Sequence, residues 1–164
     1  MMLEQLIKVG MADLNVASVT GVLKTTGLGS CVGLTLYDPR TRVAGMVHVM
    51  LPSSEIAKEG QLNIAKYADT AIPELIRRMT EVGAIANRLE AKMAGGSQMF
   101  AFSNGSDTMR IGPRNVESCK WMLENYSIPL LAEDTGSNYG RTIEFYSETG
   151  KLIIRSVQQG VKEL

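Results

Sequence analysis

The sequence predicts an α+β fold, a mixed α/β sandwich in which helices pack on an antiparallel or mixed sheet. Segments with the alternating hydrophobicity of strands outnumber those with helical spacing. Two pairs of these strand segments are joined by short turns, which indicates hairpins. The 164 residues suffice for a sizeable core, and no linker-like stretch divides them, so we expect a single domain over residues 1–164.

In the first part of the chain, residues 16–24 are rich in Val, Ser and Thr, as in a strand. Strict alternation predicts strands over 31–38 and 43–51. Asp38 and Pro39 between them suit the first two positions of a type I turn. The polar stretch 52–63 is expected to be a loop, of a length that is often functional.

Two helices follow from helical spacing. The first is predicted over about 64–79, where Pro73 should kink the helix or start it afresh and Gly83 suits its end. The second is predicted over 113–126, opened by Pro113. The remaining predicted elements are a strand at 88–93, a glycine-bearing turn at 94–100 and strands at 128–133, 141–146 and 151–157.

Charge and composition exclude several classes of protein. Lys and Arg number 17, as do Asp and Glu, so the formal net charge is zero. This balance gives no electrostatic basis for binding nucleic acid or an anionic membrane. No signal peptide is evident, and no apolar run approaches the ~18 residues of a membrane span. We therefore expect a cytoplasmic protein without membrane insertion.

Cysteine and histidine are scarce. Cys31 and Cys119 are too few for a disulfide framework, and His48 is the single histidine, so a His/Cys zinc site would lack ligands. We expect no metal and no cofactor. Cys119 lies beside Trp121 on the inner stripe of the second helix and is interpreted as a core residue.

The hairpin brings Cys31 and His48 to one face. If a two-residue turn pairs Asp38 with Thr41, Cys31 lies directly opposite His48. Pro39 and Arg40 suit a two-residue turn poorly, because the favoured types need positive φ. The expected four-residue loop on a type I turn pairs Asp38 with Val43 and makes His48 the diagonal neighbour of Cys31. Either register also aligns one aliphatic face, composed of Val32, Leu34 and Leu36 with Val43, Val47 and Val49.

A thiol beside an imidazole can serve as a nucleophile with its base. The stretch "GLGSC" before the hairpin adds backbone N–H groups that suit an oxyanion. Spacing alone leaves the packing alternative open, in which Cys31 is buried, His48 is structural and the glycines only form a turn.

Longer motifs carry a family likeness. "TTGLGSCVGLTLYD" (25–38) and "GMVHVMLP" (45–52) resemble the chemoreceptor glutamine deamidase CheD family. The resemblance continues over most of the chain, through "KYADTAI" (66–72), "RLEAKMAGGSQMF" (88–100), "IGPRNVE" (111–117) and "LLAEDTGSNYGR" (130–141).

The resemblance implies a catalytic group of Cys31, His48 and Thr25, with Thr26 where the family usually has Leu. It implies a three-layer α/β fold akin to glutamine-deamidating bacterial toxins. The implied substrates are glutamines on the cytoplasmic helices of methyl-accepting chemotaxis receptors, and the implied partner is a CheC-type phosphatase.

In the implied reaction the Cys31 thiolate attacks the glutamine amide carbon. Backbone N–H groups around Gly29 and Ser30 hold the oxyanion, His48 protonates the departing ammonia, and water cleaves the thioester to leave Glu. Loop 53–63 and turn 94–100 are candidates for the rim of a groove that admits a receptor helix. The alternatives are a regulatory module for CheC, with possible methylesterase side activity, and a thiol redox sensor, against which the lack of a nearby resolving Cys counts.

Overall fold

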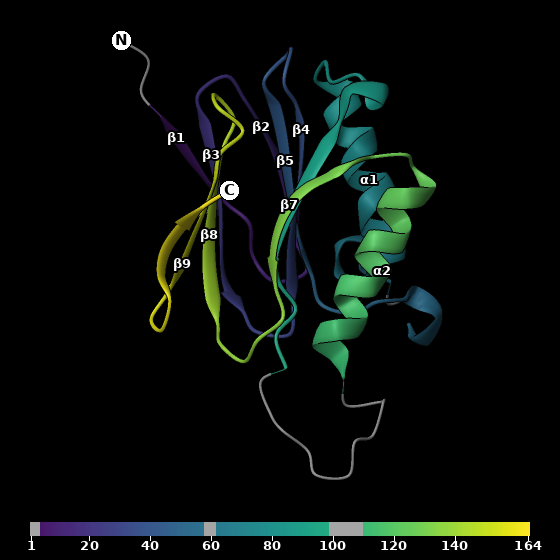
Figure 1. Ribbon diagram of the computed structural model, residues 1–164. Coiled ribbons are helices and arrows are strands. Elements are labelled where there is room, and N and C mark those ends of the chain that lie inside the picture. Colours follow the sequence, from purple (N-terminus) through teal and green to yellow (C-terminus); the bar gives the residue numbers. More distant parts are fainter. Residues whose placement is uncertain (1–3, 58–61, 99–109) are drawn as a thin grey trace.

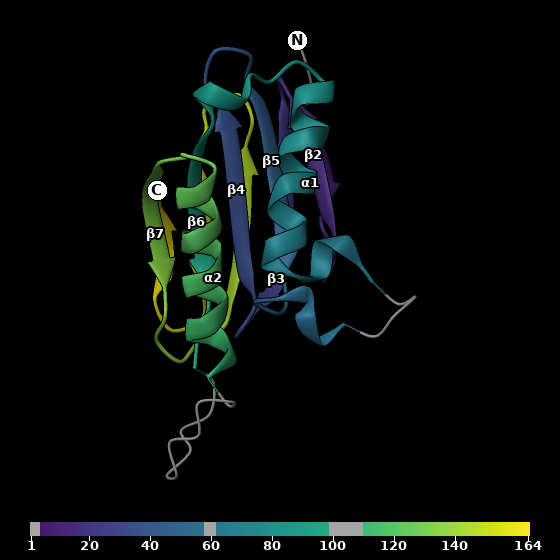
Figure 2. The same cartoon turned by 90° about the vertical axis from the view of Figure 1, so that its right-hand side faces the viewer.

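The computed structural model describes residues 4–57, 62–98 and 110–164, which form three layers (Figure 1). An outer five-stranded sheet packs on a central five-stranded sheet, and helices α1 (Ala68–Glu81) and α2 (Ile111–Asn125) cover the far face of the central sheet (Figures 1 and 2). The predicted α+β class and its three layers are confirmed.

Both sheets are mixed. Across the outer sheet the order is β1 (Gln5–Lys8), β3 (Gly21–Leu28), β8 (Arg141–Tyr146), β9 (Leu152–Ser156) and β10 (Gly160–Glu163), with β1 parallel to β3. Across the central sheet the order is β2 (Leu14–Ser18), β5 (Val43–Val49), β4 (Val32–Asp38), β6 (Glu90–Gly95) and β7 (Leu130–Thr135), with β6 parallel to β7. The other neighbouring pairs are antiparallel.

The β4–β5 hairpin has the register predicted for a four-residue loop, with Asp38 opposite Val43 and Val32 opposite Val49. Every residue of both strands is buried, because the helices cover one face and the outer sheet covers the other. The aliphatic face packs with the helices in one core cluster, whereas Cys31, Tyr37 and Met46 belong to a second cluster between the sheets.

The prediction of a single strand over 16–24 is wrong. The segment is divided into β2 in the central sheet and β3 in the outer sheet. The chain turns at Val19, whose φ is 59°, and an added Cβ at Gly21 would lie 2.6 Å from the Ala17 Cβ. This close crossing leaves room only for glycine. The short edge strands β1 and β10 were not predicted.

The first predicted helix begins too early. Residues Ile64–Lys66 form a 3₁₀ turn capped by Asn63, and the α-helix begins at Ala68 and continues without a break through Pro73. Pro73 therefore does not start a new helix. The second helix begins at Ile111, which places Pro113 in its first turn, where a missing N–H is tolerated. No helix in the described ranges has the length and apolar character needed to cross a bilayer.

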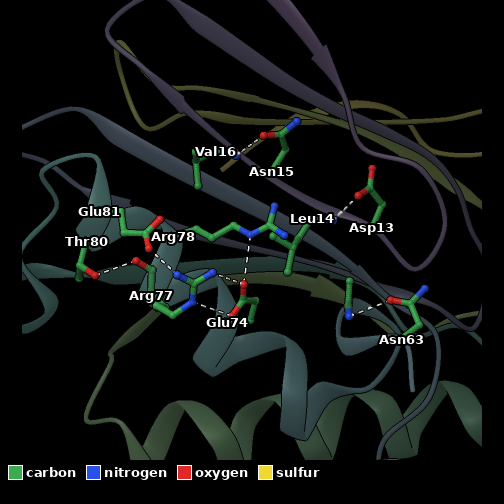
Figure 3. Close-up of polar contacts among 11 residues, drawn as sticks. Asp13, Leu14, Asn15, Val16, Asn63, Glu74, Arg77, Arg78, Thr80 and Glu81 are labelled. Atoms are coloured by element: carbon green, nitrogen blue, oxygen red, sulfur yellow. Dashed lines mark hydrogen bonds and ion pairs between the residues drawn. The ribbon is translucent and has the colours of Figure 1, made fainter. Parts of the chain in front are cut away.

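Charged side chains cover the exposed surface of α1. Arg77 lies between Glu74 and Glu81 and forms ion pairs with both, and Arg78 also contacts Glu74 (Figure 3). The hydrogen bonds from Arg77 hold the pKa of Glu74 at about 2. Since these groups are solvated, such pairs contribute little to stability. The opposite face of α1 anchors the helix on the central sheet.

Gly45 on β5 lies against the side chains of Leu75 and Met79 of α1. A Cβ added there would lie 2.6 Å from Met79 Sδ and 2.8 Å from Leu75 Cδ1. We expect Gly45→Ala to lower the free energy of unfolding by about 1–3 kcal/mol, because the helix must shift outward. Urea denaturation measures this. Gly140→Ala is the matched control, since its added Cβ has no neighbour within 4 Å; equal losses in both variants would contradict the packing argument.

Candidate active site

A hydrogen bond between the two sheets defines the candidate site. Thr25 on β3 is 2% exposed, and its Oγ1 lies 2.7 Å from Nδ1 of His48 on β5, which is fully buried. The next residue, Thr26, is exposed, as expected for successive residues of a strand. The alternation of β3 therefore selects which threonine reaches the imidazole.

Cys31 lies in the short connection through which the chain passes from β3 in the outer sheet to β4 in the central sheet. His48 is opposite Gly33, so Cys31, two residues before Gly33, lies on the same face of the hairpin, toward the outer sheet. The Cys31 side chain is 8% exposed. The Thr25–His48 hydrogen bond joins two of these residues, and Cys31 packs in the core cluster between the same two sheets.

Burial sets the charges of this group. Desolvation raises the pKa of the Cys31 thiol, and the Cys31 backbone N–H opposes this rise only in part. Desolvation also lowers the pKa of the His48 imidazole. The resting pair at neutral pH is therefore an uncharged thiol and an uncharged imidazole. Nε2 of His48 is buried and has no hydrogen-bond partner among the described residues.

Hydrogen bonds to three successive backbone carbonyl groups hold the connection that contains Cys31. The carbonyl of Gly29 accepts from the Ser97 N–H and that of Cys31 from the Gly96 N–H, each at 2.8 Å. The carbonyl of Ser30 accepts from Asn115 Nδ2 at 3.0 Å. These donors come from the end of β6 and from α2, so both elements fix the backbone around the thiol.

The N–H groups of the same connection differ in availability. The Gly29 N–H donates to the Gly27 carbonyl at 3.0 Å, within a tight turn where Gly27 has a φ of 72°. The N–H groups of Ser30 and Cys31 donate to no carbonyl or side-chain oxygen of the described residues. Of the two donors expected from the sequence, Ser30 is available and Gly29 is already engaged.

The two segments expected to form a groove rim are only partly described. In turn 94–100, Gly95 has a φ of 111°, and an added Cβ there would lie 2.2 Å from the Cys31 carbonyl oxygen. This glycine lets β6 approach the thiol segment; residues 99 and 100 lie outside the described residues. In loop 53–63, Ser54 is tied to Asp69 through Oγ and Oδ2 at 2.8 Å, and residues 58–61 lie outside the described residues.

Three buried polar residues near the site were not singled out from the sequence. Arg141 donates from Nη1 to Ser97 Oγ at 2.8 Å, and Ser97 Oγ donates to the Tyr139 carbonyl at 2.7 Å. Asn115 occupies the buried stripe of α2, four residues before Cys119. A polar residue at core spacing in a helix is the one sequence signal that could have identified Asn115.

An open cavity of about 700 Å³ lies on the outer sheet, and Gly27 is one of its lining residues. Its lining includes Tyr139, Arg141 and Val157 but none of the residues Thr25, Cys31 and His48. The cavity is therefore distinct from the thiol–imidazole group. Among the described residues, no three or more His, Cys, Asp or Glu side chains are grouped so that they could hold a metal ion.

Comparison with known proteins identifies the family of the chain. The family model described as CheD chemotactic sensory transduction matches residues 50–156. A chemoreceptor glutamine deamidase CheD of Halalkalibacterium halodurans is 54% identical over 162 residues, covering 99% of this chain and 100% of the relative. A probable chemoreceptor glutamine deamidase CheD of Lachnoclostridium phytofermentans is 55% identical, covering 98% and 99%.

A chemoreceptor glutamine deamidase CheD of Bacillus subtilis is 51% identical over 158 residues, which covers 96% of this chain and 95% of the relative. The similarity to these relatives covers nearly the whole of both chains, beyond the segment that the family model matches. The chain therefore belongs to the CheD family.

Proposed function

We propose that this chain deamidates glutamine side chains of chemoreceptors, as the names of its relatives state for those proteins. Cys31 is the nucleophile, His48 the acid and base, and Thr25 the residue that orients the imidazole. The observation that carries these roles is the buried Thr25–His48 hydrogen bond, which leaves Nε2 unpartnered on the face that also bears Cys31.

The hydroxyl of Thr25 orients the imidazole ring through Nδ1. When Nδ1–H donates to Thr25 Oγ1, Nε2 carries the lone pair and can accept the thiol proton. Sγ then attacks the amide carbon of glutamine, and the N–H groups of Ser30 and Cys31 stabilise the oxyanion. The protonated Nε2 delivers its proton to the leaving ammonia. Nε2 next deprotonates the water that cleaves the thioester, which frees Glu and the thiol.

The reaction changes glutamine and water into glutamate and an ammonium ion, and it adds one negative charge to a receptor helix. A chain without net charge needs no electrostatic steering to reach such a surface. We place this activity in the cytoplasm, and we infer no nucleic-acid partner. Binding to a CheC-type phosphatase stays a prediction from the family resemblance, and the intact group of Thr25, Cys31 and His48 favours an enzyme over a purely regulatory module.

The proposed nucleophile is tested by replacing each cysteine. We expect Cys31→Ala to abolish the conversion of Gln to Glu in a receptor cytoplasmic fragment, measured by mass spectrometry. Cys119→Ser is the control. Its thiol is fully buried and desolvation raises its pKa to about 12, so it can lower stability but should retain turnover. Persistent conversion by Cys31→Ala would sink the assignment.

The pH dependence of Cys31 alkylation tests the pairing with His48. At pH 7 we expect iodoacetamide to label Cys31 about ten- to a hundredfold faster in the unmodified protein than in His48→Ala, because the imidazole takes the thiol proton. This advantage should disappear only as the pH falls below 6.5, since burial lowers the His48 pKa from that value. Peptide mapping separates Cys31 from Cys119. Superimposable profiles would show that the side chains do not interact.

Thr25 and Thr26 provide an internal comparison on one strand. We expect Thr25→Ala to slow turnover by roughly ten- to a thousandfold, because the imidazole loses the hydrogen bond that fixes the orientation of its ring. Thr26→Leu should be nearly neutral, since Thr26 is exposed. Turnover of both variants on one receptor fragment decides the matter, and an inactive Thr26→Leu beside an active Thr25→Ala would reverse the assignment.

A further inference from the structure

Asn115 is a fully buried side chain that joins the two segments bearing the thiol and the imidazole. Its Nδ2 donates to the carbonyl of Ser30 and to the carbonyl of Met50, each at 3.0 Å. Ser30 directly precedes Cys31, and Met50 is two residues beyond His48. One amide on α2 therefore spans both segments, although no hydrogen bond links it to the thiol or the imidazole among the described residues.

The two hydrogen bonds of Asn115, called the bridge below, lie just beyond the point where the β4–β5 ladder ends. The β4–β5 ladder ends at the pair Val32 and Val49. Beyond it, the N–H of Met50 donates to the carbonyl of Lys66 at 2.9 Å and does not pair with the Cys31 segment. The Asn115 amide thus takes the place of the next rung of the ladder.

The orientation of the amide follows from its neighbours. Both partners are carbonyl groups, which only accept hydrogen bonds, so the NH₂ end must face them. The Asn115 Oδ1 atom has no partner among the described residues and is buried. Burying an unpaired carbonyl oxygen is unfavourable, so the contribution of this side chain lies in its two N–H bonds.

We propose that Asn115 is a positioning residue that sets the separation between Cys31 Sγ and His48 Nε2. It acts by tying the Ser30 and Met50 carbonyls to one point on α2. The separation matters for catalysis only if the proposed function is right, and in this respect the proposal rests on that function. The effect of Asn115 on the reactivity of the Cys31 thiol can be measured without a receptor.

Ser118, one turn further along α2, supplies a matched control. Its Oγ donates to the Pro52 carbonyl at 2.7 Å, so it also binds the helix to the segment after β5. It makes no contact with the Cys31 connection through a hydrogen bond in the described structure. Ser118→Ala therefore removes a comparable bond between α2 and this segment and leaves the bridge in place.

The test compares Asn115→Leu, which removes both donors at similar volume, with Ser118→Ala. We expect Asn115→Leu to lower kcat on a receptor fragment by about ten- to a hundredfold with little change in KM, because misplacement of a catalytic group by ~1 Å has that effect. Its Cys31 alkylation profile should approach that of His48→Ala. Ser118→Ala should retain both kcat and the unmodified alkylation profile.

Asn115→Asp keeps the test decisive if Asn115→Leu does not fold. Burial beside two carbonyls raises the pKa of the introduced carboxyl, and only its protonated form can donate one bond. The kcat of this variant relative to the unmodified protein should therefore fall as the pH rises through that raised pKa. A constant ratio across the pH range would overturn the proposal.

The outcomes also separate this proposal from the deamidase assignment. If the unmodified protein converts no glutamine, the proposed function fails, and the alkylation profiles of the variants still test Asn115. If a folded Asn115 variant shows the same Cys31 alkylation profile as the unmodified protein, the positioning role is overturned. Equal losses in Asn115→Leu and Ser118→Ala would overturn it too, because the bridge would then matter only for stability.

Discussion

The β4–β5 hairpin at the centre of the molecule is the surface on which both the helices and the outer sheet pack. Both of its faces are covered, so each side chain must match either the helices or the outer sheet. A slip of one residue would exchange the two faces and place the imidazole among the aliphatic side chains that contact α1. The register of this hairpin is therefore both the main packing constraint and the condition for bringing His48 toward Thr25 and Cys31.

Thr25, Cys31 and His48 are all buried. Burial keeps the thiol and the imidazole uncharged at rest, and the Thr25–His48 bond satisfies only one ring nitrogen. A buried polar group with an unpaired nitrogen lowers the stability of the fold unless other hydrogen bonds hold its geometry. Here the fixing bonds reach the thiol segment from the end of β6 and from α2. The central sheet and the helix layer thus both hold one short connection, through the carbonyls of Gly29, Ser30 and Cys31.

Local patterns predicted much of the fold. The strand at 141–146 and the hairpin register follow from alternation and from the Asp-Pro turn, in which Asp38 Oδ1 accepts the N–H of Arg40 at 3.0 Å. Periodicity could not locate where a continuous β-like stretch leaves one sheet for another, so 16–24 was assigned to one strand. It also could not separate the 3₁₀ turn at Ile64–Lys66 from the helix that follows, because both repeat every three to four residues.

By itself the sequence determined which face of the 31–38 and 43–51 strands is apolar, that Thr25 and Thr26 point to opposite faces, and that the hairpin places Cys31 on the face of His48, whereas the choice of Thr25 came from the family motif. The first three are consequences of the two-residue period of a strand and of the length of one turn. Only the tertiary structure decided that the Thr25 hydroxyl meets the imidazole across two sheets, that the Gly29 N–H is engaged, and that Asn115 spans Ser30 and Met50. Those contacts join segments far apart in the chain, and their partners are set by how whole layers pack, which no local period encodes.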